Sequence, residues 1–375
     1  MLQRPDYGRL PWWWIAASAL LSLIGIAFVL SATQEAAVGA SWMTRDGAAQ
    51  AVWWLVGGIG GAMAVHVAPL TWRRYAFPLC LAGLVVMVAM QLLAGTALVP
   101  RIKGQANWIV LGGFRLQPVE LVKLATLLAC ATLTDGPNFQ AKRLSHCLLL
   151  LLVAGIPSLV IAREDLGSAL TFMPMALGIL LVAGMRLRHF SLAILAVVLI
   201  GCAAYALLPR DGPKAYQWRR IDAWVYPERY ALAEAYQTDR SKRSIGSGQW
   251  TGKGYMQGEQ NRLGWVPEKH TDLIFAVVGE EVGFIGSAGF VLLIIAWCAA
   301  GLVAAARAST AWGRHFIGGF VCLIAGQAAI NLAVALGMMP VTGVTLPFVS
   351  YGGSSLIACW IGLGIACSAA ASNET

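Results

Sequence analysis

Residues 282–305 read VGFIGSAGFVLLIIAWCAAGLVAA and contain no charged side chain. A helix needs about 20 apolar residues to cross the hydrocarbon core of a bilayer, so this stretch is long enough to span a membrane. Other apolar runs follow one another along the chain: Pro11–Ser31, Ala51–Pro69, Tyr75–Leu93, Gln117–Thr134, Ser145–Ala162, Leu166–Met185, His189–Leu208, His315–Leu336 and Leu346–Ala371. The sequence therefore predicts an all-α integral membrane protein with about ten transmembrane helices.

The composition agrees with a single polytopic membrane domain over residues 1–375. Of these residues 58% are hydrophobic and only 12% are charged, whereas a soluble domain has about 25% charged residues. The first apolar run follows Arg4 and Arg9 without a cleavage motif, so we expect it to act as a signal anchor. All eight cysteines lie within apolar stretches without metal-ligand spacing, which predicts packing residues and not a disulfide framework.

The formal net charge of +9 comes from basic residues that flank the apolar runs. This distribution suits anionic membrane lipids or an anionic lipid-linked substrate and argues against nucleic acid as a partner. With the N-terminus inside, the short cytoplasmic segments hold Arg4, Arg9, Arg73, Arg74, Lys142, Arg143, Arg186, Arg188, Arg307 and Arg314, and the short external loops hold Arg45, Arg101, Lys103, Arg115 and Arg163. By the positive-inside rule we expect a multi-pass protein of the inner cell membrane with both termini in the cytoplasm.

Residues 209–271 form the one long segment between predicted spans, and we expect it on the extracytoplasmic side. Trp218, Ile221, Trp224 and Val225 have the spacing of a short amphipathic helix at the membrane interface. The glycine-rich stretch Gly246–Gly264 is predicted to form a loop. We find no internal repeat, which argues modestly against a transporter built from inverted repeats.

Ionisable residues near membrane depth each cost about 2.5–3.5 kcal/mol at a helix centre, so they are functional candidates. The expected topology gathers the following near the external half: Glu120, Lys123, Arg163, Glu164, Asp165, Asp272, Glu280 and Glu281. Glu120 and Lys123 are three residues apart and can pair on one helix face, either to let the helix insert or to serve a substrate. The Arg163–Asp165 cluster could be either a solvated turn or part of a functional site.

Asp272 stands where the long external segment meets the next helix. A carboxylate at a helix N-terminus is stabilised as the anion, so a plain helix-end charge explains it. It could equally act as a general base, although its reference pKa of about 3.9 makes it a weak one unless desolvation raises the pKa. Both interpretations stay open on the local sequence.

A small-residue motif precedes the last span, namely Ser350, Tyr351, Gly352, Gly353 and Ser354. Glycine and small hydroxyl residues allow helices to pack closely. Their backbone N–H groups could also bind a phosphate. We regard packing as the stronger interpretation.

Four blocks of the chain resemble the SEDS family (shape, elongation, division and sporulation) of peptidoglycan glycosyltransferases, with features closest to its RodA-like members. The first two blocks are GQANWIVLGGFRLQPVELVK at 104–123 and DLGS at 165–168. The third is Tyr236-Gln237 followed by SKRSIGSGQWTGKGYMQGEQNRLGWVPEKHTDLIFAVVGEEVGFIG at 241–286. The fourth runs from Asn331 to Ser355 and ends in MMPVTGVTLPFVSYGGSS. They occur in the family's order within a frame of apolar spans.

The chain departs from the family pattern at several positions. Asn107 stands where the family has an arginine, and Val119 replaces the serine of a QPS motif. Arg163 and Glu164 precede Asp165 where the family has Gln-Pro. Because Glu120, Lys123 and Asp272 are retained, the resemblance implies an active but diverged member.

The resemblance implies polymerisation of lipid II into β-1,4-linked glycan on the outer face, with Asp272 as general base and undecaprenyl pyrophosphate as leaving group. Supporting or orienting roles are implied for Glu120, Lys123, Asp165, Trp108 and Gln117. Candidate contacts to the pyrophosphate are Arg101, Lys103, Arg163, Arg243, Lys253 and Arg262. A lipid II flippase and a non-catalytic scaffold of the elongation machinery are the rival functions.

The implied partners are lipid II, the nascent glycan strand, a class B penicillin-binding protein as transpeptidase, and other cell-wall elongation proteins. No cofactor is identified from the sequence, which shows no ligand cluster. Whether Mg²⁺ or another divalent cation assists the leaving group stays open.

Overall fold

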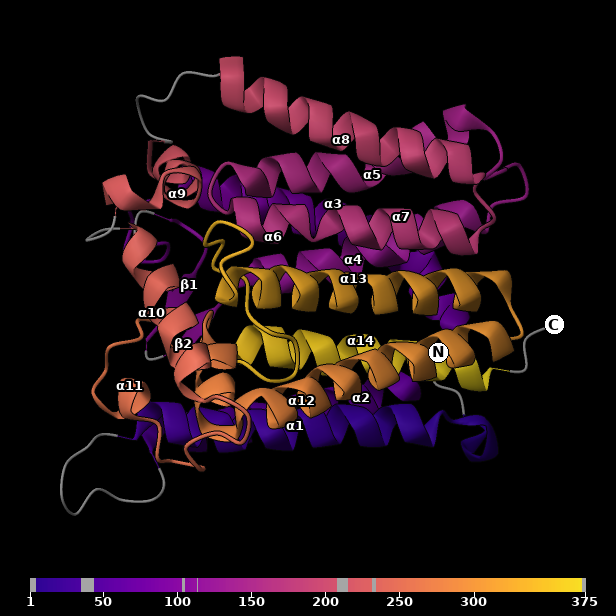
Figure 1. Ribbon diagram of the computed structural model, residues 1–375. Coiled ribbons are helices and arrows are strands. Elements are labelled where there is room, and N and C mark those ends of the chain that lie inside the picture. Colours follow the sequence, from indigo (N-terminus) through magenta and orange to yellow (C-terminus); the bar gives the residue numbers. More distant parts are fainter. Residues whose placement is uncertain are drawn as a thin grey trace.

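The computed structural model describes residues 5–34, 44–102, 105–112, 114–207, 215–230 and 234–372. Every predicted span contains a helix, and these helices lie side by side with roughly aligned axes (Figure 1). They are α1 (Trp12–Thr33), α2 (Arg45–Val65), α3 (Pro69–Leu92), α4 (Pro118–Thr134), α5 (Leu144–Ala162), α6 (Leu166–Leu170), α7 (Phe172–Val182), α8 (Leu187–Leu207), α12 (Ile274–Arg307), α13 (Ala311–Ala335) and α14 (Gly353–Ala371). Within the described ranges, seven helices are long and apolar enough to cross a membrane, and Leu166–Val182 and Leu187–Ala203 form shorter apolar helices. The chain is therefore a multi-pass, nearly all-helical membrane protein.

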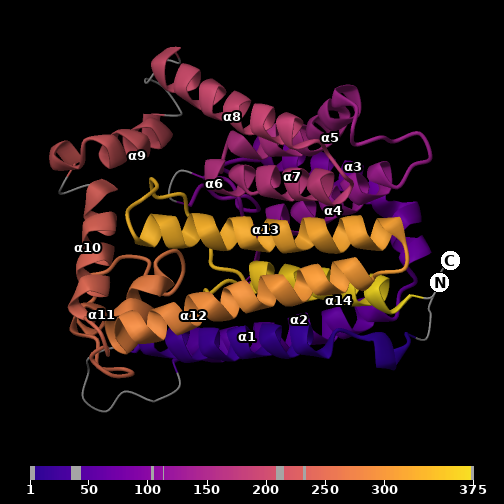
Figure 2. The same ribbon diagram turned by 45° about the vertical axis from the view of Figure 1, so that its right-hand side comes forward.

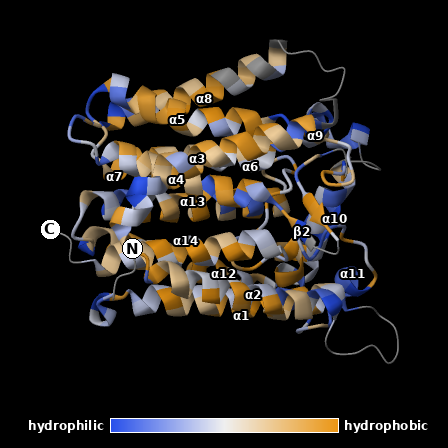
Figure 3. Ribbon diagram, turned by 180° about the vertical axis from the view of Figure 1, so that it is seen from behind, coloured by the Kyte–Doolittle hydropathy of each residue, from blue (hydrophilic) through white to orange (hydrophobic). Residues whose placement is uncertain are grey.

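The two ends of the bundle differ. The marked termini lie at one end, with the short helix η1 (Tyr7–Arg9), whereas the remaining small elements gather at the other, which we call the loop end (Figures 1 and 2). These elements are β1 (Ile109–Leu111), β2 (Phe114–Leu116), α9 (Ala215–Val225), η2 (Pro227–Tyr230), α10 (Glu234–Ser247) and α11 (Glu259–Arg262). Hydropathy colouring shows apolar helix bodies with hydrophilic residues concentrated at both ends (Figure 3).

The predicted amphipathic helix is confirmed as α9, and the predicted loop Gly246–Gly264 is largely confirmed, apart from the last turn of α10 and the single turn α11. Neither the β1–β2 hairpin nor α10 was predicted. The antiparallel hairpin pairs Ile109 with Leu116, and strands of three residues carry too little periodicity to be recognised. The helix α10 is strongly polar, so no apolar pattern marked it.

α12 begins at Ile274, close to where Asp272 was expected to meet a helix and before the apolar run that starts at Val282, and it is kinked at Gly283 (φ 65°). The kink frees helical backbone groups, which then pair with the preceding loop. Phe284 N–H and Ile285 N–H donate to the carbonyls of Gln249 (2.8 Å) and Trp250 (3.1 Å). This pairing satisfies backbone N–H groups that the kink would otherwise leave unpaired.

The last predicted span is also corrected. α14 begins at Gly353, and residues 341–352, here called the α13–α14 segment, are not helical. The segment contains Pro347, which disfavours a continuous helix, and two residues with positive φ, Gly343 (77°) and Phe348 (65°). Packing holds the unusual conformation of Phe348, whose ring lies 5.5 Å from that of the fully buried Trp297.

Candidate active site

The α13–α14 segment is joined to the loop that carries Asp272. Ser350 Oγ donates a hydrogen bond to the Thr271 carbonyl (2.6 Å), and Tyr351 N–H donates to the His270 carbonyl (2.9 Å). The His270 and Tyr351 rings lie 5.6 Å apart. The third and fourth sequence blocks therefore meet at the loop end of the bundle.

Asp272 lies two residues before α12, so it precedes the helix and does not form its first turn. The residue is half-buried. Its carboxylate lies against Gly343, because Oδ2 is 3.7 Å from the position that a Cβ would occupy there. Asn331 of α13 donates through Nδ2 to the carbonyls of Asp272 (2.8 Å) and Val344 (2.7 Å). Backbone and side chain of Asp272 are thus both held against the α13–α14 segment.

Asp165 is buried, which contradicts the interpretation of its cluster as a solvated turn. It is the N-cap of α6 and accepts hydrogen bonds from Ser168 N–H (3.0 Å) and Ser168 Oγ (2.7 Å). Burial raises the pKa of the Asp165 carboxyl above its ordinary value, against the lowering effect of the Ser168 hydrogen bonds. The family motif at this position therefore forms a helix cap inside the protein.

Three consecutive residues bring three parts of the loop end together. The Val341 carbonyl accepts from Arg220 of α9 (3.4 Å). Next along the chain, Thr342 lies against the first turn of α6, where a Cβ on Gly167 would come within 2.4 Å of the Thr342 carbonyl. Gly343 then faces Asp272. The second block is thus adjacent to the third and fourth.

The predicted pair of Glu120 and Lys123 is confirmed. Lys123 Nζ lies 2.8 Å from both carboxylate oxygens of Glu120, and both residues are almost fully buried. Lys123 also donates to Gln327 Oε1 (3.0 Å), and Gln327 Nε2 donates to the Thr345 carbonyl (3.1 Å). This arrangement makes the pair an internal support of the α13–α14 segment and favours a structural role.

The Ser350–Ser354 motif makes packing contacts. Gln50 of α2 donates through Nε2 to the Ser350 carbonyl (3.0 Å), and its Oε1 accepts from Gly352 N–H (3.3 Å). Ser354 Oγ accepts from Gln117 N–H (2.9 Å), just before α4. The Gly352 amide already has a protein partner, so the structure favours packing over phosphate binding at this position.

The first block borders the turn at residues 163–165. Glu164 accepts from Ala106 N–H (3.1 Å) and lies 3.9 Å from the exposed Arg101. Arg163 is exposed and Trp108 is half-buried. Asn107, the departure from the family arginine, is only 2% exposed, so it provides no cation at the surface.

The other candidate cations have different surroundings. Lys253 is engaged by the buried Glu280 (3.0 Å), and this carboxylate raises the pKa of Lys253 although partial burial alone would lower it. Arg243 pairs with Asp239 (2.8 Å), and Arg262 is exposed on α11. Lys103 lies outside the described residues.

A cavity of about 330 Å³ opens between α9, α10 and the chain that follows α13. Its charged lining consists of Arg220, Lys242, Arg243 and Asp239, and we call it the basic pocket. Gly337, Pro340 and Val341 form part of its wall. Arg243 was among the predicted cations, but Arg220 and Lys242 were missed.

Sequence reasoning also missed three buried amides, Gln50, Gln327 and Asn331. A usable signal existed, since each is a polar residue in or beside an apolar span. Within the described ranges, no three His, Cys, Asp or Glu side chains gather as a metal site requires.

Comparison with solved structures supports the same architecture. One chain comes from work titled "Structural coordination of polymerization and crosslinking by a peptidoglycan synthase complex". It shares 27% sequence identity with a TM-score of 0.78, over 96% of this chain and 97% of that chain. The rod shape determining protein RodA of Thermus thermophilus gives 25% identity and a TM-score of 0.69, over 98% of both chains.

Sequence relatives cover most of the chain. A protein of Geobacter sp. (strain M18) named "Probable peptidoglycan glycosyltransferase FtsW" is 32% identical over 93% of both chains. Peptidoglycan glycosyltransferase MrdB of Escherichia coli (strain K12) is 34% identical over 78% of this chain and 76% of its own. The model of the FtsW, RodA and SpoVE family, described as cell cycle proteins, matches residues 11–375. This chain belongs to the FtsW/RodA/SpoVE family.

Proposed function

We propose that this protein is a peptidoglycan glycosyltransferase that polymerises lipid II, with Asp272 as its general base. One observation carries the proposal: the half-buried Asp272 carboxylate lies against Gly343, in the segment where the second and third family blocks meet the fourth. The curated relatives are named as peptidoglycan glycosyltransferases, which supports the reaction class.

In the proposed reaction, the acceptor sugar's 4-hydroxyl attacks the anomeric carbon of the donor. Asp272 takes the hydroxyl proton while the new C–O bond forms. The bond between the anomeric carbon and the diphosphate oxygen breaks, and undecaprenyl pyrophosphate leaves with the electron pair. Attack from the opposite side inverts the linkage from α to β.

The basic pocket is the site that we propose for the diphosphate. Its wall residue Val341 is two residues from Gly343, and two Cα–Cα steps cover at most about 7.6 Å. The wall of the pocket therefore lies next to the residue that faces Asp272, as a diphosphate attached to the reacting carbon requires. Arg220 and Lys242 would supply its positive charge, since Arg243 already pairs with Asp239 and Lys253 with Glu280.

The polyprenyl tail requires an apolar path beside this site. α8 is tilted away from α5 and α7 in both views (Figures 1 and 2), and its side chains are widely exposed, including Leu192, Leu195 and Leu199. We propose that the tail lies along this helix, with the sugar directed to the loop end.

The proposal places the loop end outside the cell and both termini in the cytoplasm of an inner-membrane protein. The termini lie opposite the loop end (Figure 1), and the distribution of Lys and Arg supports this orientation. A class B penicillin-binding protein is the proposed transpeptidase partner, because one structural relative belongs to a complex that coordinates polymerisation and crosslinking.

Purified protein in liposomes with lipid II tests the function. Glycan polymer from wild-type protein, with and without the proposed partner, supports the enzyme. Translocation of lipid II without polymer would establish the flippase instead. If the protein shows neither polymerisation nor translocation, the scaffold role remains and the proposal is refuted.

A further inference from the structure

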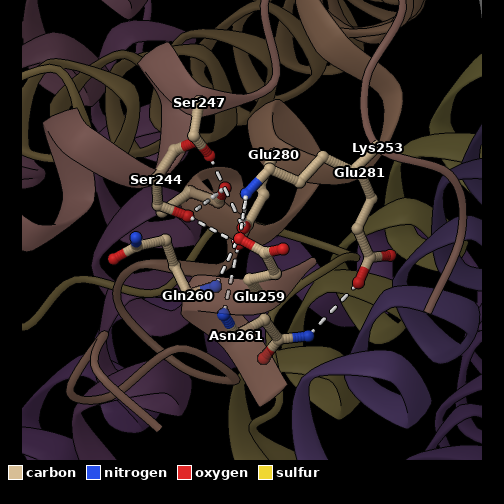
Figure 4. A network of polar contacts seen from close by, with 9 residues as sticks. Ser244, Ser247, Lys253, Glu259, Gln260, Asn261, Glu280 and Glu281 are labelled. Carbon is tan, nitrogen blue, oxygen red and sulfur yellow. Dashed lines mark hydrogen bonds and ion pairs between the residues drawn. The ribbon is translucent and has the colours of Figure 1, made fainter. Parts of the chain in front are cut away.

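A second buried carboxylate, Glu280, lies in α12 two turns beyond Asp272 and has no part in the proposed chemistry. Its side chain is fully buried. Figure 4 shows donors from α10, α11 and the intervening loop converging on it. A buried carboxylate carries a large desolvation cost unless it is well paired, so the identity of its partners indicates its role.

Glu280 accepts hydrogen bonds from four well-placed donors. Two are backbone amides in the first turn of α11, Gln260 N–H (2.9 Å) and Asn261 N–H (3.1 Å). The others are Ser244 Oγ of α10 (3.1 Å) and Lys253 Nζ (3.0 Å). One carboxylate therefore fastens α10, α11 and the loop between them to α12.

The backbone is shaped to admit this carboxylate. A Cβ on Gly258, just before α11, would lie 2.9 Å from Glu280 Oε2. A Cβ on Gly252 would lie 2.2 Å from the Glu281 carbonyl, and one on Gly248 would lie 2.0 Å from the Gly279 carbonyl. The loop thus packs backbone to backbone against α12, with Glu280 at the centre.

α11 is in turn attached to the segment that carries Asp272. The Asn261 carbonyl accepts a short hydrogen bond from Lys269 Nζ, and Lys269 is three residues before Asp272. Asn261 therefore connects Glu280, through its N–H, with the Asp272 segment, through its carbonyl.

Building on the proposed function, we infer that Glu280 is a positioning residue that sets the placement of Asp272 through α11 and Lys269. Its negative charge is required because these four partners, like the more distant Ser247 Oγ (3.5 Å), are all donors, and a charge-assisted hydrogen bond is about twice as strong as a neutral one. Glu280→Gln would present its NH₂ group to at least one of these donors. α11 would then loosen and the base would lose its fixed position.

The test compares wild-type protein, Glu280→Gln and Glu259→Gln in lipid II liposomes. Glu259 is the matched control, because it is the other carboxylate beside Lys253 but is 76% exposed. Misplacing a reacting group by about 1 Å can cost about 100-fold in rate. We expect Glu280→Gln to lower kcat roughly 10- to 100-fold with KM within about twofold, and Glu259→Gln to match wild type.

Hydrogen exchange of the peptide covering residues 258–272 gives a readout independent of activity. We expect faster amide exchange there in Glu280→Gln, with unchanged exchange in α13. Wild-type kcat in Glu280→Gln, or a loss of kcat without faster exchange, would overturn the inference. An inactive wild-type protein would refute the proposed function instead.

Lys269→Met keeps the test decisive if Glu280→Gln does not fold. This change cuts the connection to Asn261 and leaves the Glu280 cluster intact. We expect a loss of kcat at unchanged KM and thermal stability. Full activity of Lys269→Met would show that the position of Asp272 does not depend on α11 and would refute the inference.

Discussion

Asp272 combines two features that a general base needs, contact with the site's backbone and partial access to solvent. Its carboxylate faces Gly343, where no side chain intervenes, and Asn331 anchors its carbonyl. Because Asp272 is only half-buried, a substrate hydroxyl can reach it while the protein holds its backbone in place.

Asp272→Asn should separate binding from turnover. The amide keeps the size of the side chain but removes the base, so we expect a fall in polymerisation rate of about 10²- to 10⁴-fold. Binding of fluorescent lipid II to the variant should stay within about threefold of wild type, since no charge contact to the substrate is lost. A near wild-type rate would disprove the assignment of the base.

The Glu120–Lys123 pair should behave as a structural unit. Lys123→Ala leaves the buried Glu120 carboxylate unpaired, which we expect to cost about 3–5 kcal/mol of stability. Thermal unfolding in detergent measures this loss. The double variant Glu120→Gln/Lys123→Met removes both charges and should recover most of the stability. No recovery would indicate that Lys123 serves another buried group.

At the scale of elements, the kink of α12 makes the loop end possible. Gly283 has a φ of 65°, and a Cβ there would lie 2.2 Å from Gly252 N. The residue thus meets both conditions that require glycine, a left-handed conformation and a close backbone approach.

Gly283→Ala should therefore be more damaging than a matched change in the same helix. Gly289 is the control, because a Cβ there meets nothing within 4 Å. We expect Gly283→Ala to lose about 1–3 kcal/mol or more of stability, and Gly289→Ala to be neutral or slightly stabilising. Equal thermal midpoints for the two variants would contradict this reading of the kink.

The elements also show what a sequence can and cannot predict. Spans such as α5 and α13 were predicted closely, because length and hydropathy alone define a membrane helix. Only the start of the predicted span Leu346–Ala371 was wrong, since residues 346–352 belong to the buried α13–α14 segment and the helix α14 begins at Gly353. The conformation of residues 341–352 depends on partners in other elements, namely Gln50 of α2, which is 300 residues from Ser350 in the sequence, and Asn331 of α13.

At the scale of the whole molecule, the site is built by convergence. The expected topology placed Asp272, Glu120 and Lys123 near the external half, and the α13–α14 segment connects them. Gly343 faces Asp272, and the Thr345 carbonyl accepts from Gln327, which in turn accepts from Lys123. Single cations could not be ranked in this way. From the sequence, Lys253 was a reasonable candidate for binding phosphate, and only the fold shows that it forms an ion pair with Glu280.

The basic pocket is a property of the whole fold, since Arg220, Lys242 and Val341 come from α9, α10 and the chain beyond α13. If it binds the diphosphate, Lys242→Gln should raise KM for lipid II about 5- to 10-fold with a smaller change in kcat, because a ground-state contact is lost. Arg229→Gln is the control, an exposed cation on η2 outside the pocket lining. Added inorganic pyrophosphate should inhibit wild-type protein more strongly than Lys242→Gln. Equal inhibition of both proteins would place the diphosphate elsewhere, with Arg101 and Arg163 beside Glu164 as the next cations to substitute.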